Sequence, residues 1–365
     1  MKKRWIAFLS LIMSLLLCLV VFTSCDNNKT NESENTSETS STETTTSSEE
    51  STSSSEISKP SVNPGSAGLI YEVNADGKTY TVTGLGTCQD RKIIIPSVFE
   101  GLAVTQIGDY AFRGCDTLTS VEFPESVTSI GEGAFSECVG LTHVVIPDSV
   151  KNIGNKAFYS CTGLKQLRIG NGLTEIGDKV FYSCYNLTEL TIPDNVKSIG
   201  SDAFRYCSGL QTLSFGNGVT HIGASAFYEC TSLTNITLPK SVTEIGEYAF
   251  SNCSGLTEIK LGGGLQSIGN SAFNYCTKLK SVEIPDSVTT IGEWVFAMCM
   301  DLQTVTIGNG VQSIGQCVFS NCLGLSEIHY KGTQVQWKAV AKDSYWQSGA
   351  FLKNVVCSDG TIVLE

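Results

Sequence analysis

The stretch AFSECVGLTHVVIPDSVKNIGNKAFYSC, residues 134–161, contains one phrase twice. Ala134-Phe135-x-x-Cys138 returns as Ala157-Phe158-x-x-Cys161, 23 residues later. Ile-Gly pairs and leucines keep the same period, which predicts a solenoid in which each unit forms one coil. The phrase continues without an insertion through ten cysteines: Cys115, Cys138, Cys161, Cys184, Cys207, Cys230, Cys253, Cys276, Cys299 and Cys322.

Each unit predicts two short extended segments and one tight turn. In the unit that begins at Leu118, Val121 and Phe123 alternate as in a strand, and Pro124 ends it. Residues 127–130 fit a second extended piece. Residues 134–138 are expected to form a single helical turn with Ala, Phe and Cys on one side. Because a lone coil cannot bury that apolar side, the coils must stack, Leu on Leu and Phe on Phe.

The turn after the first strand alternates between two types. Proline fixes φ there, whereas Gly-Asn-Gly permits positive φ. The alternation indicates that the chain grew by duplication of 46-residue pairs of units. The alternating positions are Pro147, Gly170, Pro193, Gly216, Pro239, Gly262, Pro285 and Gly308.

The unit L-x-S-V-x-I-P-x-S-V-T-x-I-G-x-x-A-F-x-x-C resembles the leucine-rich repeat of the BspA-like bacterial surface proteins. The resemblance covers residues 106–329 and implies a right-handed stack of leucine-rich coils with caps at both ends. An N-terminal cap is expected over residues 67–105, from the hairpin pattern of residues 71–84 and a degenerate repeat at 93–108. Residues 329–340 and 355–364 resemble the family's terminal helix and hairpin, so a C-terminal cap is expected over 330–365.

The first 25 residues predict an export signal. A basic start, residues 1–4, precedes an apolar run over residues 5–22. Thr23 and Ser24 then place small residues before Cys25, which resembles a bacterial lipobox in which Cys25 is lipidated. Phe22 departs from that pattern, which usually has an aliphatic residue there. Plain secretion and a retained membrane helix remain alternatives, since the run is long enough to span a bilayer.

Residues 26–66 are almost entirely Ser, Thr, Glu and Asn. Such a segment has no apolar side chains to offset the entropy cost of ordering, so we expect it to be disordered. As a flexible coil it would span roughly 35 Å. Together with a lipid on Cys25, this segment predicts a tether that exposes the remaining chain at the bacterial cell surface.

The ten repeated cysteines are best explained as core residues. Equivalent positions in stacked coils point in parallel about 4.8 Å apart. Disulfides need converging Cβ atoms, and metal ligands must converge on one point. Cysteine packed as a small hydrophobe fits instead. Cys317 is out of phase with the ten and is expected to be exposed, while Cys88 and Cys357 lie in opposite caps and cannot meet.

Charge and histidine placement exclude several functions. The formal charge of −12 makes a nucleic-acid partner implausible. His143, His221 and His329 occupy different phases of the repeat, and His143 and His329 lie roughly 38 Å apart at the strand spacing. No catalytic triad, metal motif or phosphate loop follows, so we expect neither an enzyme nor a cofactor.

The best candidate for binding is a stripe just after the repeated phenylalanine. Tyrosine and arginine are typical of binding hot spots, and the stripe stops where Ser251, Asn274, Ala297 and Ser320 follow. Ring stacking that shields the core would give the same pattern. We call this set the tyrosine stripe: Tyr159, Tyr182, Arg205 and Tyr228, with Tyr206 and Tyr275 one residue further on.

Polar strand positions offer a second candidate surface. They point outward and vary from coil to coil, although ordinary solvated surface would look the same. These positions include Ser120, Glu122, Gln166, Arg168, Glu189, Thr191, Glu258, Lys260 and Glu283. The family resemblance implies adhesion to host proteins, other bacteria or matrix, through a macromolecular ligand that we expect to be a protein. A glycan-binding lipoprotein that uses the tyrosine stripe, and a structural envelope protein without a discrete ligand, remain alternatives.

Overall fold

The computed structural model describes residues 65–364, which belong to one compact unit of the chain. The expected export signal, Cys25 and nearly all of the expected tether lie outside the described residues. Ser66, at the end of that tether, is buried, and its backbone N–H donates to the carbonyl oxygen of Ile94 at 2.8 Å.

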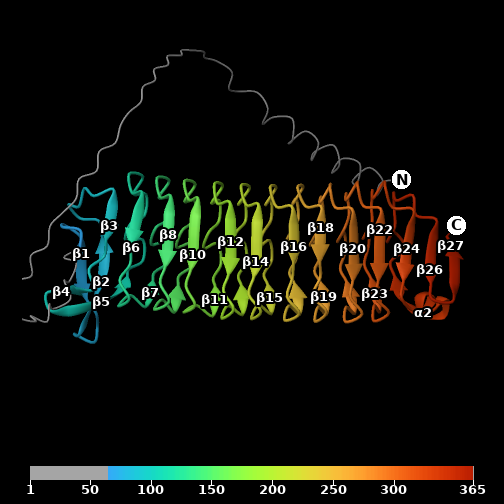
Figure 1. The fold of residues 1–365 in the computed structure, drawn as a ribbon, viewed down its shortest axis with the longest axis horizontal. Helices are drawn as coiled ribbons and strands as arrows, with labels where there is room; N and C mark the ends of the chain where they lie inside the picture. Colours follow the sequence, from blue (N-terminus) through green and yellow to red (C-terminus); the bar gives the residue numbers. More distant parts are fainter. Residues whose placement is uncertain (1–64, 365) are drawn as a thin grey trace, which may run out of the picture. The chain divides into compact units, whose positions relative to one another are not determined.

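The described residues form a β-solenoid of stacked coils, ordered along the row from the N-terminal cap to the C-terminal cap (Figure 1). Each coil contributes a first strand and a shorter second strand. The first strands are β6 (Ser120–Glu122), β8 (His143–Ile146), β10 (Gln166–Ile169), β12 (Glu189–Ile192), β14 (Thr212–Phe215), β16 (Asn235–Thr237), β18 (Glu258–Lys260), β20 (Ser281–Ile284), β22 (Thr304–Ile307) and β24 (Glu327–Tyr330). The second strands are β7 (Ser129–Ile130), β9 (Asn152–Ile153), β11 (Glu175–Ile176), β13 (Ser198–Ile199), β15 (His221–Ile222), β17 (Glu244–Ile245), β19 (Ser267–Ile268), β21 (Thr290–Ile291), β23 (Ser313–Ile314) and β25 (Ala341–Lys342).

Strands of neighbouring coils pair in parallel, in the register that the repeat predicts. Gln166 pairs with His143, and Leu167 pairs with Val144. Side chains alternate along each first strand, so that Val144 is buried while His143 and Val145 are exposed. The exposed side chains of the first strands together form a polar surface, which we call the strand face.

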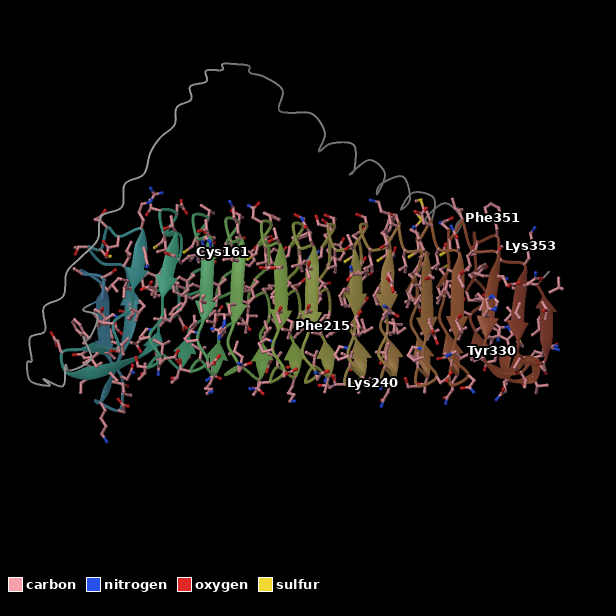
Figure 2. The ribbon with its side chains drawn as sticks, in the orientation of Figure 1. Cys161, Phe215, Lys240, Tyr330, Phe351 and Lys353 are labelled. Carbon is pink, nitrogen blue, oxygen red and sulfur yellow. The ribbon has the colours of Figure 1, made fainter. Side chains whose placement is uncertain are left out.

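The core consists of columns of identical side chains. The ten phenylalanines from Phe112 to Phe319 are fully buried and form a continuous stack. Neighbouring rings lie 5.0–5.9 Å apart between centroids and are nearly parallel. Figure 2 shows Cys161 in the upper half of the row and Lys240 at its lower edge, so the cysteine column and the proline turns lie toward opposite edges of the coils.

The expected helical turn at residues 134–138 is wrong in its local geometry. The backbone N–H of Ser136 donates to Gly133 within the coil, whereas those of Phe135 and Glu137 donate to the next coil. Glu137 has a φ of 63° and breaks any helix. The segment is a pair of tight turns, because two of its five backbone N–H groups are used to join coils.

The glycine of each Ile-Gly pair allows neighbouring coils to approach each other closely. A Cβ built on Gly200 would lie 2.7 Å from the carbonyl carbon of Gly177 and 2.8 Å from the amide nitrogen of Asp178. The carboxylate of Asp178 meanwhile accepts the backbone N–H of Ser201 at 2.7 Å. Glycine is therefore required by the spacing of the coils and not by an unusual φ.

Both ends of the stack are covered by caps. At the N-terminal end, β1 (Ile70–Val73) and β2 (Thr79–Gly84) form the antiparallel hairpin expected from residues 71–84. The degenerate repeat supplies β3 (Lys92–Ile94) to the first-strand row and β5 (Leu102–Ile107) to the second-strand row. This repeat is five residues longer than a regular unit, since Ile107 follows Pro96 by 11 positions where Ile130 follows Pro124 by 6. In the added length β4 (Val98–Phe99) pairs antiparallel with β5.

At the C-terminal end, a short helix and a hairpin close the core. Helix α2 (Gln334–Ala339) begins at Thr333 with a capping box and buries Trp337. Strands β26 (Asn354–Cys357) and β27 (Gly360–Val363) form the expected hairpin. No helix within residues 65–364 is long and apolar enough to cross a membrane.

The expectation that Cys317 is exposed is wrong. Only 6% of this residue is accessible, because the C-terminal cap continues the stack over it. Its backbone N–H donates to the carbonyl oxygen of Tyr345 at 3.2 Å, and Phe319 bonds to Trp346 in the same way. The position of Cys317 within the repeat shows that it is not one of the ten repeated cysteines. The repeat does not show that the C-terminal cap covers it.

Steps from one coil to the next are of two kinds. We call a coil a Pro coil or a Gly coil after the residue that follows its first strand. At a step from a Pro coil to a Gly coil, the first strands pair fully, as β12 does with β14. The backbone N–H of Gly216 donates to Ile192 at 2.8 Å, and that of Asn217 donates to the carboxylate of Asp194 at 2.7 Å. The alternating turns are therefore the two halves of one interlocking contact.

At a step from a Gly coil to a Pro coil, the first-strand ladder opens. Strands β10 and β12 belong to separate sheets, and so do β14 and β16. Strands β18 and β20 share a single residue pair, Glu258 with Ser281. Proline contributes to the opening because it has no N–H to donate to the preceding coil.

Candidate binding surfaces

The structure brings five of the six residues of the tyrosine stripe together. Tyr159 and Tyr182 stack with ring centroids 4.8 Å apart. Tyr206 meets Tyr182 edge to face at 5.3 Å and Tyr228 edge to face at 5.8 Å. All four rings are half-buried. This contiguous arrangement offers flat aromatic surface and hydroxyl groups to a ligand, while each ring also packs against a neighbour.

Arg205 lies at the centre of this group. Its guanidinium carbon is 4.4 Å from the ring centroid of Tyr228 and 4.8 Å from that of Tyr206. One guanidinium nitrogen donates to the carboxylate of Asp202 at 2.9 Å, and another donates to the hydroxyl of Tyr206 at 3.1 Å. Burial alone would lower the pKa of Arg205, but these two hydrogen bonds raise it, so the charge is permanent.

Tyr275 does not join the cluster. It occupies the same phase as Tyr206, three coils further along the chain. The cluster ends at Tyr228, whose hydroxyl accepts a hydrogen bond from Asn252 at 2.9 Å. Burial raises the pKa of Tyr182 and of Tyr228, so both hydroxyls stay protonated at neutral pH.

The strand face carries charges of both signs. Lys260 pairs with Glu258 at 3.1 Å within one strand, and Lys331 reaches Glu283 at 2.6 Å from two coils away. Such exposed pairs contribute little to stability. They do fix where positive and negative groups stand, which matters for recognising a partner.

Shallow depressions lie along the strand face. Two occupy equivalent places four coils apart, one between β10 and β12 and the other between β18 and β20. Another runs along the starts of β14 to β20 and is lined by Thr212, Asn235, Gly255 and Lys278 among others. A further depression lies over the fully paired strands β8 and β10 and includes His143 in its lining. Sequence reasoning missed these depressions, because they depend on how the exposed side chains of neighbouring coils lie and not on the repeat itself.

Other chemistry-bearing residues do not assemble. We call the ten repeated cysteines, Cys115 to Cys322, the ladder cysteines. From Cys138 onward, the thiol of each one donates a hydrogen bond to a phenylalanine carbonyl oxygen of the preceding coil, at 3.0–3.5 Å. The three histidines lie on β8, β15 and β24, in separate coils. Within residues 65–364, no group of three or more His, Cys, Asp or Glu side chains is placed to hold a metal ion.

The chain is similar to two solved structures of bacterial leucine-rich repeat proteins. A leucine-rich cell surface protein from Faecalibacterium prausnitzii has 28% identity, and the match covers 79% of this chain and 100% of that one, with a TM-score of 0.43. A leucine-rich repeat protein from T. pallidum has 27% identity over 58% of this chain and 88% of that one, with a TM-score of 0.45. A search of the curated proteins found no match.

The family model carries the assignment. The model of the BspA type leucine-rich repeat region, which spans six copies of the repeat, matches residues 87–211 and again residues 197–326. These two ranges cover all ten Phe-x-x-Cys coils seen in the structure. The chain therefore belongs to the family of BspA-type leucine-rich repeat proteins.

Proposed function

We propose that this protein is an exported lipoprotein of the bacterial surface whose solenoid binds another macromolecule, a protein. In this proposal Cys25 carries the lipid, residues 26–64 hold the solenoid away from the membrane, and the protein has no catalytic role. Family membership supports the proposal, because a rigid stack of coils presents long, varied surfaces. In this proposal, binding of the solenoid to its protein partner attaches the bacterium to the surface that carries that partner.

We place the protein ligand on the tyrosine stripe. The observation that carries this choice is the contiguous cluster of Tyr159, Tyr182, Tyr206 and Tyr228 around Arg205, half-buried and restricted to four coils. Tyrosine and arginine dominate interface hot spots. A shield for the phenylalanine column would be needed along the whole stack, but the same phase holds Ser251 and Ala297 in later coils.

The test is a triple variant with alanine at Tyr159, Tyr182 and Tyr228. Purified soluble protein would be offered to a panel of host extracellular matrix proteins and to whole bacteria, and its melting temperature measured beside wild type. A matched control replaces three exposed tyrosines outside the stripe, Tyr110, Tyr185 and Tyr248, by alanine. The stripe variant should lose at least about tenfold in affinity, or roughly 1.4 kcal/mol, and the control should not.

The outcomes separate the alternatives. Some loss of stability is expected, about 0.5–1.5 kcal/mol for each lost ring contact, so binding is measured where all variants are folded. Unchanged binding with a lowered melting temperature would show that the stripe is packing. A glycan array run in parallel distinguishes a protein ligand from a carbohydrate that stacks on the same rings.

A further inference from the structure

The last two coils and the C-terminal cap carry large apolar side chains on the turn edge of the solenoid, which is the edge formed by the Phe-x-x-Cys turns. Both methionines within residues 65–364, Met298 and Met300, lie there, and Met300 is exposed. Trp294 is 40% exposed, whereas Trp337 and Trp346 are 2% and 8% exposed. We call the following set the apolar patch: Trp294, Met298, Met300, Leu323, Tyr345 and Phe351.

The repeat itself does not require apolar side chains at these places. Where Met300 and Leu323 stand, the four coils before them have small polar residues: Ser208, Thr231, Ser254 and Thr277. Exposed apolar side chains gathered in one place mark interaction sites on soluble proteins, because water gains free energy when they are covered. The patch therefore indicates a partner.

Met300 and Leu323 lie side by side in the last two coils. The backbone N–H of Gly324, which follows Leu323, donates to the carbonyl oxygen of Met300 at 3.2 Å. Met298 belongs to the same turn as Met300 and is half-buried, and the exposed Trp294 precedes both. In this coil the patch runs along the whole turn.

The cap continues the patch beyond the last coil. The backbone N–H of Lys353 donates to the carbonyl oxygen of Ser326 at 2.9 Å, so the segment that includes Phe351 stacks on that coil. Figure 2 shows Phe351 at the upper edge of the C-terminal end. The carbonyl oxygen of Tyr345 accepts the backbone N–H of Cys317 at 3.2 Å, which places Tyr345 on the same coil. The patch thus has three layers, two coils and the cap.

Opposite charges stand at the two ends of the patch. Asp301 directly follows Met300 in the first layer, and Lys353 lies two residues after Phe351 in the third. Both side chains are exposed, and neither forms an ion pair within residues 65–364. A patch of this kind is complementary to a second copy of itself turned end for end.

We propose that two copies of this chain pair through their apolar patches, about a two-fold axis that crosses the row at Leu323. In this arrangement Leu323 meets its own counterpart, and Met300 meets the cap segment that carries Phe351. Trp294 lies against Tyr345 of the second copy. A two-fold contact of one patch with itself is the commonest symmetry of soluble oligomers.

The same axis brings the opposite charges together. Asp301 of each copy approaches Lys353 of the other, within the reach of a lysine side chain. Glu293 and Asp343 meet at the exposed rim, where salt screens like charges. The tyrosine stripe ends three coils before the coil of Trp294, so it stays open in the dimer. The dimer therefore does not depend on the proposed protein ligand.

Other occupants fit less well. Three exposed acids border the patch, Glu293, Asp301 and Asp343, whereas surfaces that bind anionic lipids carry clusters of Lys and Arg. A partner of one charge sign would match only one end of the patch. Six side chains from each copy are fewer than the roughly 20–30 residues of a standard interface, so we expect a weak dimer, with a Kd of about 10–100 μM.

Sedimentation velocity of the mature chain, residues 26–365, tests the proposal between about 1 and about 200 μM. The weight-average sedimentation coefficient should rise with concentration toward the value for a dimer and not beyond it. A patch variant combines Met300→Thr, Leu323→Thr and Phe351→Ser. It should dimerise at least about tenfold more weakly and keep its melting temperature, since only exposed side chains change.

Two controls locate the contact. The first places threonine at two exposed apolar positions in the phase of Met300 but in distant coils, Val139→Thr and Tyr185→Thr. The second is the triple alanine variant of the tyrosine stripe. Both should dimerise as wild type does. The second control separates the dimer contact from the surface proposed for the protein ligand.

Charge reversal tests the two-fold pairing. Asp301→Lys and Lys353→Asp should each weaken the dimer about threefold or more, because each places like charges opposite one another. The double variant should recover the wild-type affinity, since the reversed charges match again. A mixture of the two single variants should form a heterodimer that is tighter than either homodimer.

A monomer at every concentration would overturn the proposal, and so would an unchanged dimer in the patch variant with its melting temperature intact. Growth beyond the dimer would mean a head-to-tail contact in place of the two-fold one. If the double charge variant does not recover, the two-fold pairing is wrong. Flotation of the wild type with phosphatidylcholine vesicles, lost in the patch variant, would assign the patch to a lipid surface instead.

Discussion

The thiol of Cys161 donates a hydrogen bond to the carbonyl oxygen of Phe135, one coil earlier, at 3.1 Å. The same oxygen accepts the backbone N–H of Cys138 at 3.2 Å. Both lone pairs of a buried carbonyl are thus used, one within the coil and one between coils. Cysteine is small enough for the core and also supplies this second donor, which alanine and valine cannot do.

Replacing Cys207 by alanine should destabilise the protein by about 1–2 kcal/mol, through a small cavity and the lost bond to Phe181. Aspartate at the same position should cost much more, because it buries a charge. Urea denaturation measures both. Cys115, the first ladder cysteine, is half-buried and provides the control. Its replacement by alanine should lower the free energy of unfolding by less. Equal costs at the two positions would contradict this account.

Cys115 should be the first ladder thiol to react with iodoacetamide in the native protein. Cys115 is half-buried, whereas the other nine ladder cysteines are buried, so the reagent reaches the Cys115 thiol first. Burial raises the pKa of Cys161, Cys207 and Cys253 to about 12, so these thiols stay protonated and inaccessible. Peptide mapping by mass spectrometry identifies the modified site.

After denaturation without reductant, all ten ladder thiols should become reactive. A count well below ten would mean that ladder cysteines are paired as disulfides, contrary to the packing described. Native labelling spread evenly over the ladder would instead mean that the coils open readily.

Gly200→Ala should destabilise the protein by about 1–3 kcal/mol, because its Cβ would press on the backbone of the preceding coil. Gly263→Ala is a matched control at a turn where an added Cβ meets nothing within 4 Å. That variant should be neutral or more stable by up to about 1 kcal/mol, since alanine restricts the unfolded chain. Thermal melting compares the two, and similar melting temperatures would refute the close-contact role of the Ile-Gly column.

Lys156→Gly should stabilise the protein by about 0.5–1 kcal/mol. Lys156 has a φ of 59°, and a side chain in this left-handed region costs roughly 1–2 kcal/mol, more than the flexibility that glycine adds to the unfolded chain. The control is Lys165→Gly, an exposed position with negative φ, which should lose about 0.5–1 kcal/mol. If both variants lose stability, the left-handed turn is not strained.

Cys25 should carry the lipid. Radiolabelled palmitate supplied to cells that express the full chain should enter the wild-type protein and not a Cys25→Ser variant. The variant should also be released from the membrane fraction, because a diacylglyceryl cysteine supplies the two or more chains that stable anchoring requires. Equal labelling of both proteins would contradict the assignment.

Much of the fold follows from periodicity alone. The 23-residue repeat places Leu164, Phe158 and Cys161 in the core, and the structure buries all three. Within a coil, the helical turn at residues 134–138 could not be excluded from the sequence. Its backbone conformation depends on hydrogen bonds to the next coil, and these have no signature in a single unit.

The candidate sites were less predictable for the same reason. The phase of Tyr159, Tyr182 and Tyr228 predicts their alignment, but the position of Tyr206 between them depends on its left-handed backbone, with a φ of 63°. The burial of Cys317 depends on the cap, which does not follow the repeat. The open steps could have been inferred from Pro193, since a missing N–H in a parallel ladder weakens the contact with the strand before it.

The two kinds of step also give the solenoid a preferred way to yield under load. If the protein holds a partner while tethered, tension along the row acts on every contact between coils in series. The steps from Gly to Pro keep the pairing of the second strands but have few or no bonds between first strands. They would therefore separate before the interlocked steps from Pro to Gly, where both rows pair. Stretched from its ends, the chain should therefore lengthen in increments of two coils, each releasing roughly 150 Å of extended polypeptide.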